Sequence, residues 1–532
     1  MQMDTLIQNV TIIDGTGSPG YIGTVGIKNG KLYTAPTDDA DQIIDGTGLY
    51  LTPGFIDSHS HNDTAACHDI AGFSLGKISQ GITTEITGQC GESPFPIPAH
   101  AKKQQEDQLT PFLSPEIRQN LGLFTDFHAY LSYIKELPLA HNLAFNCGHS
   151  NLRCAVMGFE DRSPTALELD QMKRYLKDAM QSGCLGMTSG LLYTPGLYAD
   201  TSELIELCKV IAPFGGIYAT HIRNESDFIT DAILEAIEIA ETAKVPLILS
   251  HQKITGHHNQ HLQEKCLSII GDAIARGVSI TLDQYPYAAT STILYSLIPP
   301  RYMKKSMDEF LLSLRSASVR TAIAFTMEHD HTSFENIYYN CQGFAHITIL
   351  SAPGTPDAIS LSIESYAKKC GKSPFDTFFD LLIENHGDVL AAFFEIPDAT
   401  IDAIYQFPHT VVGSDGIITL NNAPVHPRAY GTFVRSICRF VKEKQMVSLE
   451  EAIKKQTSLT ALRWGLKHKG RIADGYDADL VLLDYDTLKD CATFSDPRRL
   501  CEGIVHVFVN GEVVYNQHAL TGRCPGRIVL RE

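Results

Sequence analysis

The sequence predicts an α/β fold: a (β/α)8 TIM-like barrel, with a small β-sandwich domain built from both termini and an insertion over the catalytic face. Three observations support this. Apolar and helical segments alternate through the middle of the chain, both ends carry short alternating strands, and one central connection is very long. We therefore expect sandwich segments at 1–52 and 466–532, and a barrel at 53–465 with its insertion at about 293–408.

Short segments at both ends alternate apolar and polar side chains. Within the first fifty residues, Asp-Gly, Asn-Gly and Gly-Thr-Gly sequences mark turns between these segments. These segments are 6–14, 24–34, 42–51, 477–486, 505–515 and 526–530. Because the two ends share one pattern and differ from the middle, we expect them to form one small sandwich. Two unrelated hairpins are the alternative.

Strand and helix patterns alternate between the two ends. Eight apolar segments are typical of strands: 51–57, 82–88, 142–148, 184–192, 216–222, 245–251, 278–287 and 410–415. Segments such as 165–183 and 231–244, between some of these strands, place apolar residues at helical spacing. Repeated strand–helix units predict parallel strands with right-handed crossovers, and eight units favour a closed barrel over an open sheet.

The connection between the seventh and eighth strands is far longer than an ordinary loop. Loops that follow barrel strands lie at the catalytic face, so we expect this segment to form a lid or subdomain there. A decoration on the outer helices is the alternative.

The bulk composition limits the partners. The formal net charge is -18, from 43 basic and 61 acidic residues, which disfavours nucleic acid and anionic membranes. No apolar run approaches the roughly 20 residues needed to span a bilayer, and the N-terminus has no signal-peptide pattern. The thirteen cysteines are odd in number and form no C-x-x-C pair, so we expect a reduced, cytoplasmic protein. The expected partner is a small molecule, and nothing in the sequence sets the oligomeric state.

Candidate metal ligands stand at or just after the ends of predicted strands. They are His59, His61, Cys90, His221, His251 and Asp415. Imidazole, thiolate and carboxylate groups bind borderline-soft divalent metals such as zinc, and catalytic sites leave one position for water. The H-x-H pair of an extended strand places both imidazoles on one face. Since the carboxyl ends of barrel strands meet at one face, the pattern predicts a metal-dependent hydrolase.

Each of these residues also has a structural interpretation. Cys90 could be a buried apolar cysteine, and Asp415 could cap a helix. A single histidine at a strand end is more often structural, but His221 and His251 hold equivalent positions in adjacent units. We leave open whether His149 lines the pocket. Other histidines are expected to be solvated or structural: His257, His258, His261 and His426.

Nine motifs together resemble a known family. They are PGFIDSHSH, GQCG, GHSNLR, GLLYTPG, THIRNE, SHQK, DQYPY followed by STIL, GSDG and HPRAYGTF. Spread over nearly the whole chain, they resemble the amidohydrolase superfamily and, within it, the N-acyl-D-amino-acid deacylases (D-aminoacylases). Many superfamily members bridge two metals with a carboxylated lysine on the fourth strand, but 184–192 contains no lysine. In the deacylase branch a cysteine after the second strand takes that role, as Cys90 could here.

The resemblance implies a metal centre and a reaction. Cys90, His221 and His251 would hold one tightly bound Zn2+. A second position, weakly occupied or empty, would be lined by His59, His61 and Asp415. The implied reaction is zinc-dependent hydrolysis of the amide bond of N-acyl-D-amino acids, giving a free D-amino acid and a carboxylate. A metal-activated water would attack, with Asp415 as general base and then general acid.

The substrate's α-carboxylate needs local donors in an acidic protein. Arg301, just after the seventh predicted strand, is our first choice. Hydrogen bonds are expected from Tyr193, Tyr287 and Ser291. By similarity, Lys253 would contact an acidic side chain or orient the site. Arg428 could bind substrate or hold the loop after the eighth strand.

Two other functions remain as alternatives. Hydrolysis of a cyclic amide, as in hydantoinases or dihydroorotases, is disfavoured by the missing lysine. A non-catalytic scaffold with the amidohydrolase fold is disfavoured because all six ligand positions are present. Gln252 stands where relatives often have histidine, so the side chain of the preferred substrate stays open. The acyl group of the substrate and the number of metals also stay open.

Overall fold

Eight parallel strand positions form the centre of the molecule in the computed structural model, which describes residues 2–37, 39–63, 70–109, 121–303, 306–418 and 425–531. Each predicted strand segment supplies one position. The strands are β6 (Phe55–Asp57), β7 (Ile82–Thr87), β8 (Asn142–Phe145) with β9 (Cys147–Gly148), β10 (Gly186–Gly190), β11 (Ile217–His221), β12 (Leu247–Leu249), β13 (Ile280–Gln284) and β17 (Thr410–Val412). Strands β8 and β9 are one strand position interrupted at Asn146.

Backbone hydrogen bonds close these strands into a barrel. One sheet contains β6, β7 and β8, and another runs from β9 through β10, β11, β12 and β13 to β17. At one seam the amide of Leu185 donates to the carbonyl of Phe145 (2.9 Å). At the other, the amide of Ser58 donates to Val412 (3.3 Å), and Ser60 forms a parallel bridge with Gly416. The predicted (β/α)8 barrel is therefore confirmed.

A buried lysine spans the seam between β17 and β6. Nζ of Lys77 lies 2.8 Å from Oδ2 of Asp57 and 2.9 Å from Oε1 of Glu85, and it donates to the hydroxyl of Ser414 (2.9 Å). All three charged side chains are fully buried. Buried charges are tolerated only when paired, so this network fixes the first, second and eighth strands relative to one another.

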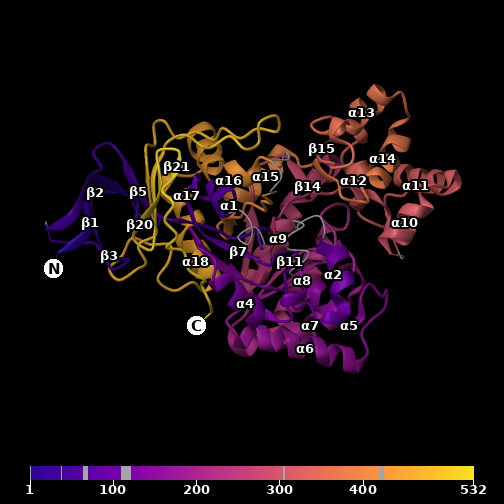
Figure 1. The fold of residues 1–532 in the computed structure, drawn as a ribbon, viewed down its shortest axis with the longest axis horizontal. Coiled ribbons are helices and arrows are strands. Elements are labelled where there is room, and N and C mark those ends of the chain that lie inside the picture. Colours follow the sequence, from indigo (N-terminus) through magenta and orange to yellow (C-terminus); the bar gives the residue numbers. More distant parts are fainter. Residues whose placement is uncertain are drawn as a thin grey trace.

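Helices cover the outside of the barrel (Figure 1). They are α1 (Ile70–Ile78), α2 (Lys102–Leu109), α4 (Phe127–Lys135), α5 (His149–Met157), α6 (Ala166–Gln181), α7 (Thr201–Ile211), α8 (Ile229–Ala243), α9 (Gln263–Ala275), α15 (Asp398–Gln406), α16 (Arg428–Ile437), α17 (Leu449–Gln456) and α18 (Ser458–Trp464). The start of α6 shows how the sequence sets a helix boundary, since Thr165 and Glu168 form a capping box.

No described helix is long and apolar enough to cross a membrane.

The long connection forms a separate lobe, seen beyond the barrel at the upper right of Figure 1. It contains an antiparallel sheet of β14 (Ala289–Ile293), β15 (Ile347–Ser351) and β16 (Leu390–Phe394). Its helices are α10 (Met307–Ser313), α11 (Ala317–His329), α12 (Ile337–Asn340), α13 (Ile363–Cys370) and α14 (Pro374–Glu384). Helix α15 falls within the expected range of about 293–408 but lies against α9, β13 and β17, so it serves as an outer barrel helix.

Both ends of the chain meet in one nine-stranded sheet, at the left of Figure 1. Its strands are β1 (Met3–Ile12), β2 (Tyr21–Lys28), β3 (Lys31–Tyr33), β4 (Ala40–Asp45), β5 (Tyr50–Pro53), β18 (Leu480–Leu483), β19 (Ile504–Val509), β20 (Glu512–Asn516) and β21 (Ala519–Leu520). The antiparallel pairing of β18 with β5 joins the ends. Buried residues of both ends, among them Ile7, Leu51, Leu480 and Phe508, share one apolar cluster, which two unrelated hairpins would not form.

Candidate metal centre

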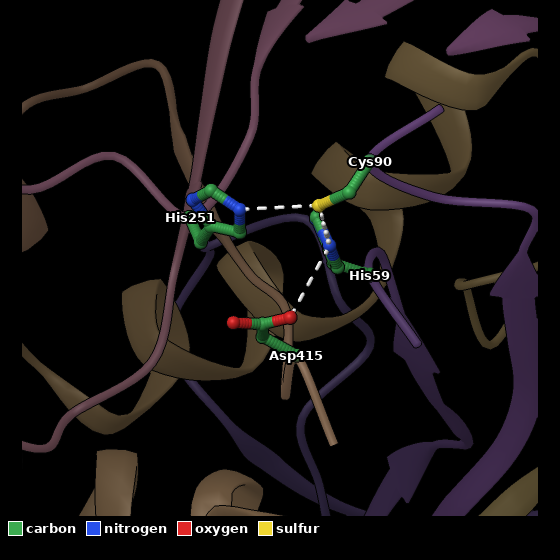
Figure 2. Close-up of side chains that lie close together, drawn as sticks. All are labelled: His59, Cys90, His251 and Asp415. Atoms are coloured by element: carbon green, nitrogen blue, oxygen red, sulfur yellow. Dashed lines mark hydrogen bonds and ion pairs between the residues drawn. The ribbon is translucent and has the colours of Figure 1, made fainter. Parts of the chain in front are cut away.

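Potential ligands from separate strands converge at the carboxyl end of the barrel. Sγ of Cys90 lies 3.2 Å from Nε2 of His251 and 3.4 Å from Nε2 of His59. Oδ1 of Asp415 lies 3.5 Å from Nε2 of His59 and 3.1 Å from Nε2 of His61. Figure 2 shows the side chains of His59, Cys90, His251 and Asp415 pointing toward one another. Their donor atoms all lie within 4.8 Å of one another, as a shared metal ion would require.

His221, at the end of β11, lies beside this cluster and next to His251. Its ring centroid lies 4.4 Å from that of His251, and its side chain is buried. Neither ring nitrogen of His221 has a hydrogen-bond partner among the described residues. A buried imidazole normally satisfies both nitrogens, so these two orphaned atoms fit a metal ligand. His221 and His251 also form a second potential ligand group with Glu225.

Three of these residues adopt a left-handed backbone conformation that favours glycine. The φ angle is 52° at Cys90, 34° at His251 and 49° at Asp415. Non-glycine residues held in sparsely populated backbone regions cost about 1–3 kcal/mol each and concentrate at functional sites. Each of the three residues lies in a turn shortly beyond the end of a strand. The turn directs the side chain toward the centre of the barrel face.

Asp283, near the end of β13, supports two of the candidate histidines. Its Oδ1 accepts a hydrogen bond from the amide of His251 (2.7 Å) and lies 3.2 Å from Nδ1 of His59. A carboxylate at Nδ1 fixes the ring orientation and leaves Nε2 free to face the cluster. Asp283 therefore orients His59 without pointing into the cluster itself.

Burial sets the charges of these candidate ligands. It lowers the pKa values of His221 and His251 well below the usual value, so both imidazoles are neutral and able to coordinate a cation. Burial alone would raise the pKa of Asp415, but the Arg428 guanidinium holds that pKa well below its usual range. Burial raises the pKa of the Cys90 thiol well above its usual value. A bound dication favours the thiolate, so metal binding at Cys90 would release a proton.

A cavity opens beside these ligands and is lined by several of the residues expected to bind substrate. Tyr193, Lys253 and Ser291 line it. Arg428 lines it too, with Nη1 2.8 Å from Oδ2 of Asp415, and its side chain is almost fully buried. The chain thus brings two cationic side chains next to the ligand cluster.

Arg301 is not brought to this cavity. It lies in a short turn of the insertion, where its side chain is 55% exposed. It donates a hydrogen bond to Thr326 and lies 3.9 Å from Asp330. Arg301 follows β13 closely in sequence, but β14 lies between them and leads the chain away from the barrel into the lobe. The placement contradicts the expectation that Arg301 lines the site.

Tyr287 also lies away from the cavity. It is buried, its hydroxyl donates to the carbonyl of Pro427 (3.3 Å), and the Arg435 guanidinium covers its ring. Tyr285, two residues earlier, lines the cavity instead, between Lys253 and Arg428. The expectation that Tyr287 lines the site is therefore corrected.

The remaining histidines have other partners. Nε2 of His149 lies 2.8 Å from Glu203, whose other oxygen accepts from Arg153, so His149 belongs to a buried network behind the cluster. His426 is buried with Nε2 3.1 Å from the carbonyl of Ala289. His257, His258 and His261 lie in an exposed or partly exposed turn.

Comparisons with known proteins match this arrangement. The amidohydrolase family model matches residues 42–293 and 362–515. A D-aminoacylase of Alcaligenes xylosoxydans xylosoxydans is 34% identical, with 99% of this chain and 98% of that protein aligned. An N-acyl-D-aspartate deacylase of the same organism is 33% identical, with 99% and 95% aligned. The chain belongs to the amidohydrolase family, in its N-acyl-D-amino-acid deacylase branch.

Solved structures agree with this family assignment. The N-acyl-D-glutamate deacylase of Bordetella bronchiseptica, crystallised with zinc and a phosphonate inhibitor that mimics the tetrahedral intermediate, superposes with a TM-score of 0.82 at 29% identity. That superposition covers the whole of both chains. A D-hydantoinase structure superposes with a TM-score of 0.56 at 15% identity, a likeness that shows the fold alone.

In this amidohydrolase the fourth strand, β10, makes room for the turn that carries Cys90. The strand reads GMTSG and contains no lysine. A Cβ atom at Gly190 would lie 2.2 Å from the carbonyl oxygen of Cys90, so only glycine permits this approach. The hydroxyl of Thr188 accepts from the amide of Gly91 (3.0 Å) and donates to the carbonyl of Gly88 (2.6 Å). The turn that carries Cys90 is thereby held against β10.

Several cavity residues escaped the sequence analysis: Glu92, Glu225, Tyr285, Thr290, Glu335 and Glu395. Glu225 follows β11 within the THIRNE motif, so the strand-end rule that found His221 could have found it as well. Glu335 and Glu395 come from the insertion, where no strand-end pattern marks them. Their position in the cavity follows only from the fold.

Removing the thiol tests the metal centre. We expect Cys90→Ala to lose most of its bound divalent metal after dialysis, because one ligand of a shared ion is lost. Cys147→Ala, which changes a buried cysteine at the end of the third strand, should keep it. Metal per chain is measured by plasma mass spectrometry, with circular dichroism as the check on folding. Equal metal content in Cys90→Ala and the parent protein would contradict a thiolate ligand.

Proposed function

We propose that this protein hydrolyses the amide bond of N-acyl-D-amino acids, giving a free D-amino acid and a carboxylate, with zinc as its metal. The observation that carries the proposal is the buried Asp415, held between the H-x-H imidazoles and Arg428 beside Cys90 and His251. Similarity to deacylases along the whole chain supports the same reaction. The zinc in the related N-acyl-D-glutamate deacylase structure supports the choice of metal.

The donor set suits zinc. Cys90, His221 and His251 would hold the tightly bound ion, and His59, His61 and Asp415 would line a second, weaker position. Thiolate and neutral imidazole are the ligands that zinc prefers. When bound, zinc would activate a water for attack and polarise the amide carbonyl.

Asp415 would move the proton. Arg428 keeps the pKa of its carboxyl low, so Asp415 is ionised at neutral pH and can accept the proton of the attacking water. It would then deliver this proton to the departing amide nitrogen. The ion pair with Arg428 and the contact with His61 hold the carboxylate in one orientation. No covalent bond between the protein and the substrate is needed.

The α-carboxylate would bind Arg428, with Lys253 and Ser291 nearby. Nη2 of Arg428 donates to the carbonyl of Ser291 (3.1 Å), while Nε has no hydrogen-bond partner among the described residues. Arg428 therefore replaces Arg301 in this role. Burial raises the pKa of Tyr193 well above its usual value, so its hydroxyl stays protonated and can donate to the carbonyl oxygen of the substrate.

The alternatives have less support. Cyclic-amide hydrolysis would be supported only by the likeness to D-hydantoinase, which is a likeness of fold alone. Strand β10 also lacks the lysine that we associate with the cyclic-amide hydrolases. A non-catalytic scaffold would have no need of three strained, converging ligand positions. We further propose a cytoplasmic enzyme acting on small molecules, since every cysteine that the structure describes is free.

The substrate class is tested with zinc-loaded protein and a panel of N-acetyl-D-amino acids, N-acetyl-L-amino acids and hydantoins. We expect turnover of D-substrates only, because, once the carboxylate and the carbonyl are both held, only one enantiomer can direct its side chain into the rest of the cavity. Activity confined to L-substrates or to cyclic amides would overturn the proposal.

Asp415→Asn should keep its zinc but lose roughly 10²–10⁴-fold in kcat, the range that general acid–base catalysis supplies. Asparagine has nearly the same shape but cannot take up the proton of water. Metal content and steady-state kinetics are measured on the same preparation. Near-normal turnover would remove Asp415 from the reaction.

Arg428→Ala and Arg301→Ala distinguish the two candidate carboxylate anchors. We expect Arg428→Ala to lower kcat/KM roughly 10- to 100-fold or more, because charged hydrogen bonds contribute about 1.5–3 kcal/mol. The exposed Arg301→Ala should leave kcat and KM unchanged and serves as the matched control. The reverse result would restore Arg301 to the site.

A further inference from the structure

Three of the four glutamates that line the cavity lie close to one another, and we call them the acidic wall: Glu225, Glu335 and Glu395. Glu225 belongs to the barrel, whereas Glu335 and Glu395 come from the insertion. Glu335 precedes α12, and Glu395 follows β16 directly. The amide of Gly256 donates to the carbonyl of Glu395 (2.9 Å), which holds the insertion against the barrel at this point.

The acidic wall has more carboxyl groups than cations. Nζ of Lys253 contacts both oxygens of Glu225, at 2.6 and 2.8 Å. Neither Glu335 nor Glu395 takes part in any ion pair formed by the described residues. Glu335 accepts a hydrogen bond from the amide of Glu225 (2.6 Å), and Glu395 accepts one from the hydroxyl of Thr290 (2.7 Å). Two carboxyl groups therefore face the cavity without a cation.

One carboxyl oxygen is buried without a partner. Glu395 is only 2% exposed, and its Oε2 accepts no hydrogen bond from the described residues. Burial raises the pKa of Glu395 to about 8, and the neighbouring Glu225 adds to this rise. Burial beside Glu225 also raises the pKa of Glu335 well above its usual value. A cationic group in the cavity would favour the ionised forms of these two carboxyl groups and pair with them.

We propose that the acidic wall binds a cationic substrate side chain, so that the preferred substrates are N-acyl derivatives of basic D-amino acids such as D-lysine and D-arginine. This inference rests on the deacylase function proposed above. It names the amino-acid side chain that the enzyme selects, and it assigns that selection to Glu395 and Glu335.

The geometry of β14 places the two anchors within reach of one amino acid. Ser291 accepts from Arg428 through its carbonyl, and the adjacent Thr290 donates its hydroxyl to Glu395. Arg428 and Glu395 thus contact neighbouring residues of β14 and line one cavity, in which a substrate with its carboxylate on Arg428 would extend a long side chain toward Glu395. Ile293 and Ile337 line the same cavity and offer apolar surface to the methylene groups of that side chain.

The same wall would repel acidic side chains. Two of the related proteins are named for N-acyl-D-aspartate and N-acyl-D-glutamate. An anionic side chain among three carboxyl groups would be unpaired or would force them to stay protonated. The charge of this cavity therefore separates the preference of this chain from that of those relatives.

The test compares N-acetyl-D-lysine with N-acetyl-D-norleucine, which has the same carbon chain without the ammonium group, and with N-acetyl-D-glutamate. Zinc-loaded protein should show a kcat/KM roughly 10- to 100-fold higher for the lysine derivative than for the norleucine derivative, the range for a charged hydrogen bond. The glutamate derivative should be the poorest of the three. Equal or better use of norleucine, or a preference for glutamate, would overturn the inference.

Glu395→Gln tests the wall directly, because glutamine keeps the shape but removes the charge. We expect roughly a tenfold loss in kcat/KM for N-acetyl-D-lysine and no change for N-acetyl-D-norleucine, whose turnover also shows that the variant folds. Glu364→Gln, at an exposed acid of α13, is the matched control and should change neither value. Equal losses on both substrates would mean that Glu395 is structural, and the inference would fall.

The two proposals fail differently. If the parent protein turns over norleucine but not lysine, the deacylase function stands and the acidic wall is wrongly assigned. If no N-acetyl-D-amino acid is turned over, the deacylase function fails, and the side-chain preference that rests on it fails as well.

Discussion

The closure of the barrel between β17 and β6 is the constraint on which the rest of the site depends. The amide of Asp415 donates to the carbonyl of His59 (2.8 Å), which ties the eighth strand to the first. The hydroxyl of Ser414 donates to Asp57, 357 residues away in sequence, and both contact the buried Lys77. This seam sets the carboxylate of Asp415 beside the H-x-H imidazoles, and no local feature of either segment could do so.

The barrel and the insertion contribute different parts of the site. Strand ends supply the potential ligands, with burial keeping the imidazoles of His221 and His251 neutral and Arg428 keeping Asp415 ionised. The insertion adds Thr290, Glu335 and Glu395 on the far side of the cavity. Rigid parallel strands suit chemistry that needs fixed distances, whereas a separate lobe can vary in sequence without disturbing the ligand cluster. On the two proposals made above, the reaction would belong to the barrel and the choice of side chain to the lobe.

The sequence predicts the ligand cluster well because one rule connects it to the fold. The carboxyl ends of parallel strands meet at one face, so residues such as Cys90 and Asp415 could be grouped without coordinates. The rule fails for Arg301, since a residue that follows a strand joins the site only if the chain stays there, and β14 leads away. It gives no information on Glu335 and Glu395, which reach the cavity through the packing of a lobe that has its own sheet and core. The left-handed backbone at His251 is likewise invisible in sequence, because it is imposed by the surrounding structure.

X-ray absorption spectroscopy at the zinc edge of the loaded protein tests most directly whether the strand ends share one metal. A centre that includes Cys90 predicts a sulfur shell at about 2.3 Å together with nitrogen or oxygen neighbours at about 2.0–2.1 Å. The sulfur shell should vanish in Cys90→Ala. A first shell of nitrogen and oxygen alone in the parent protein would contradict the centre described here.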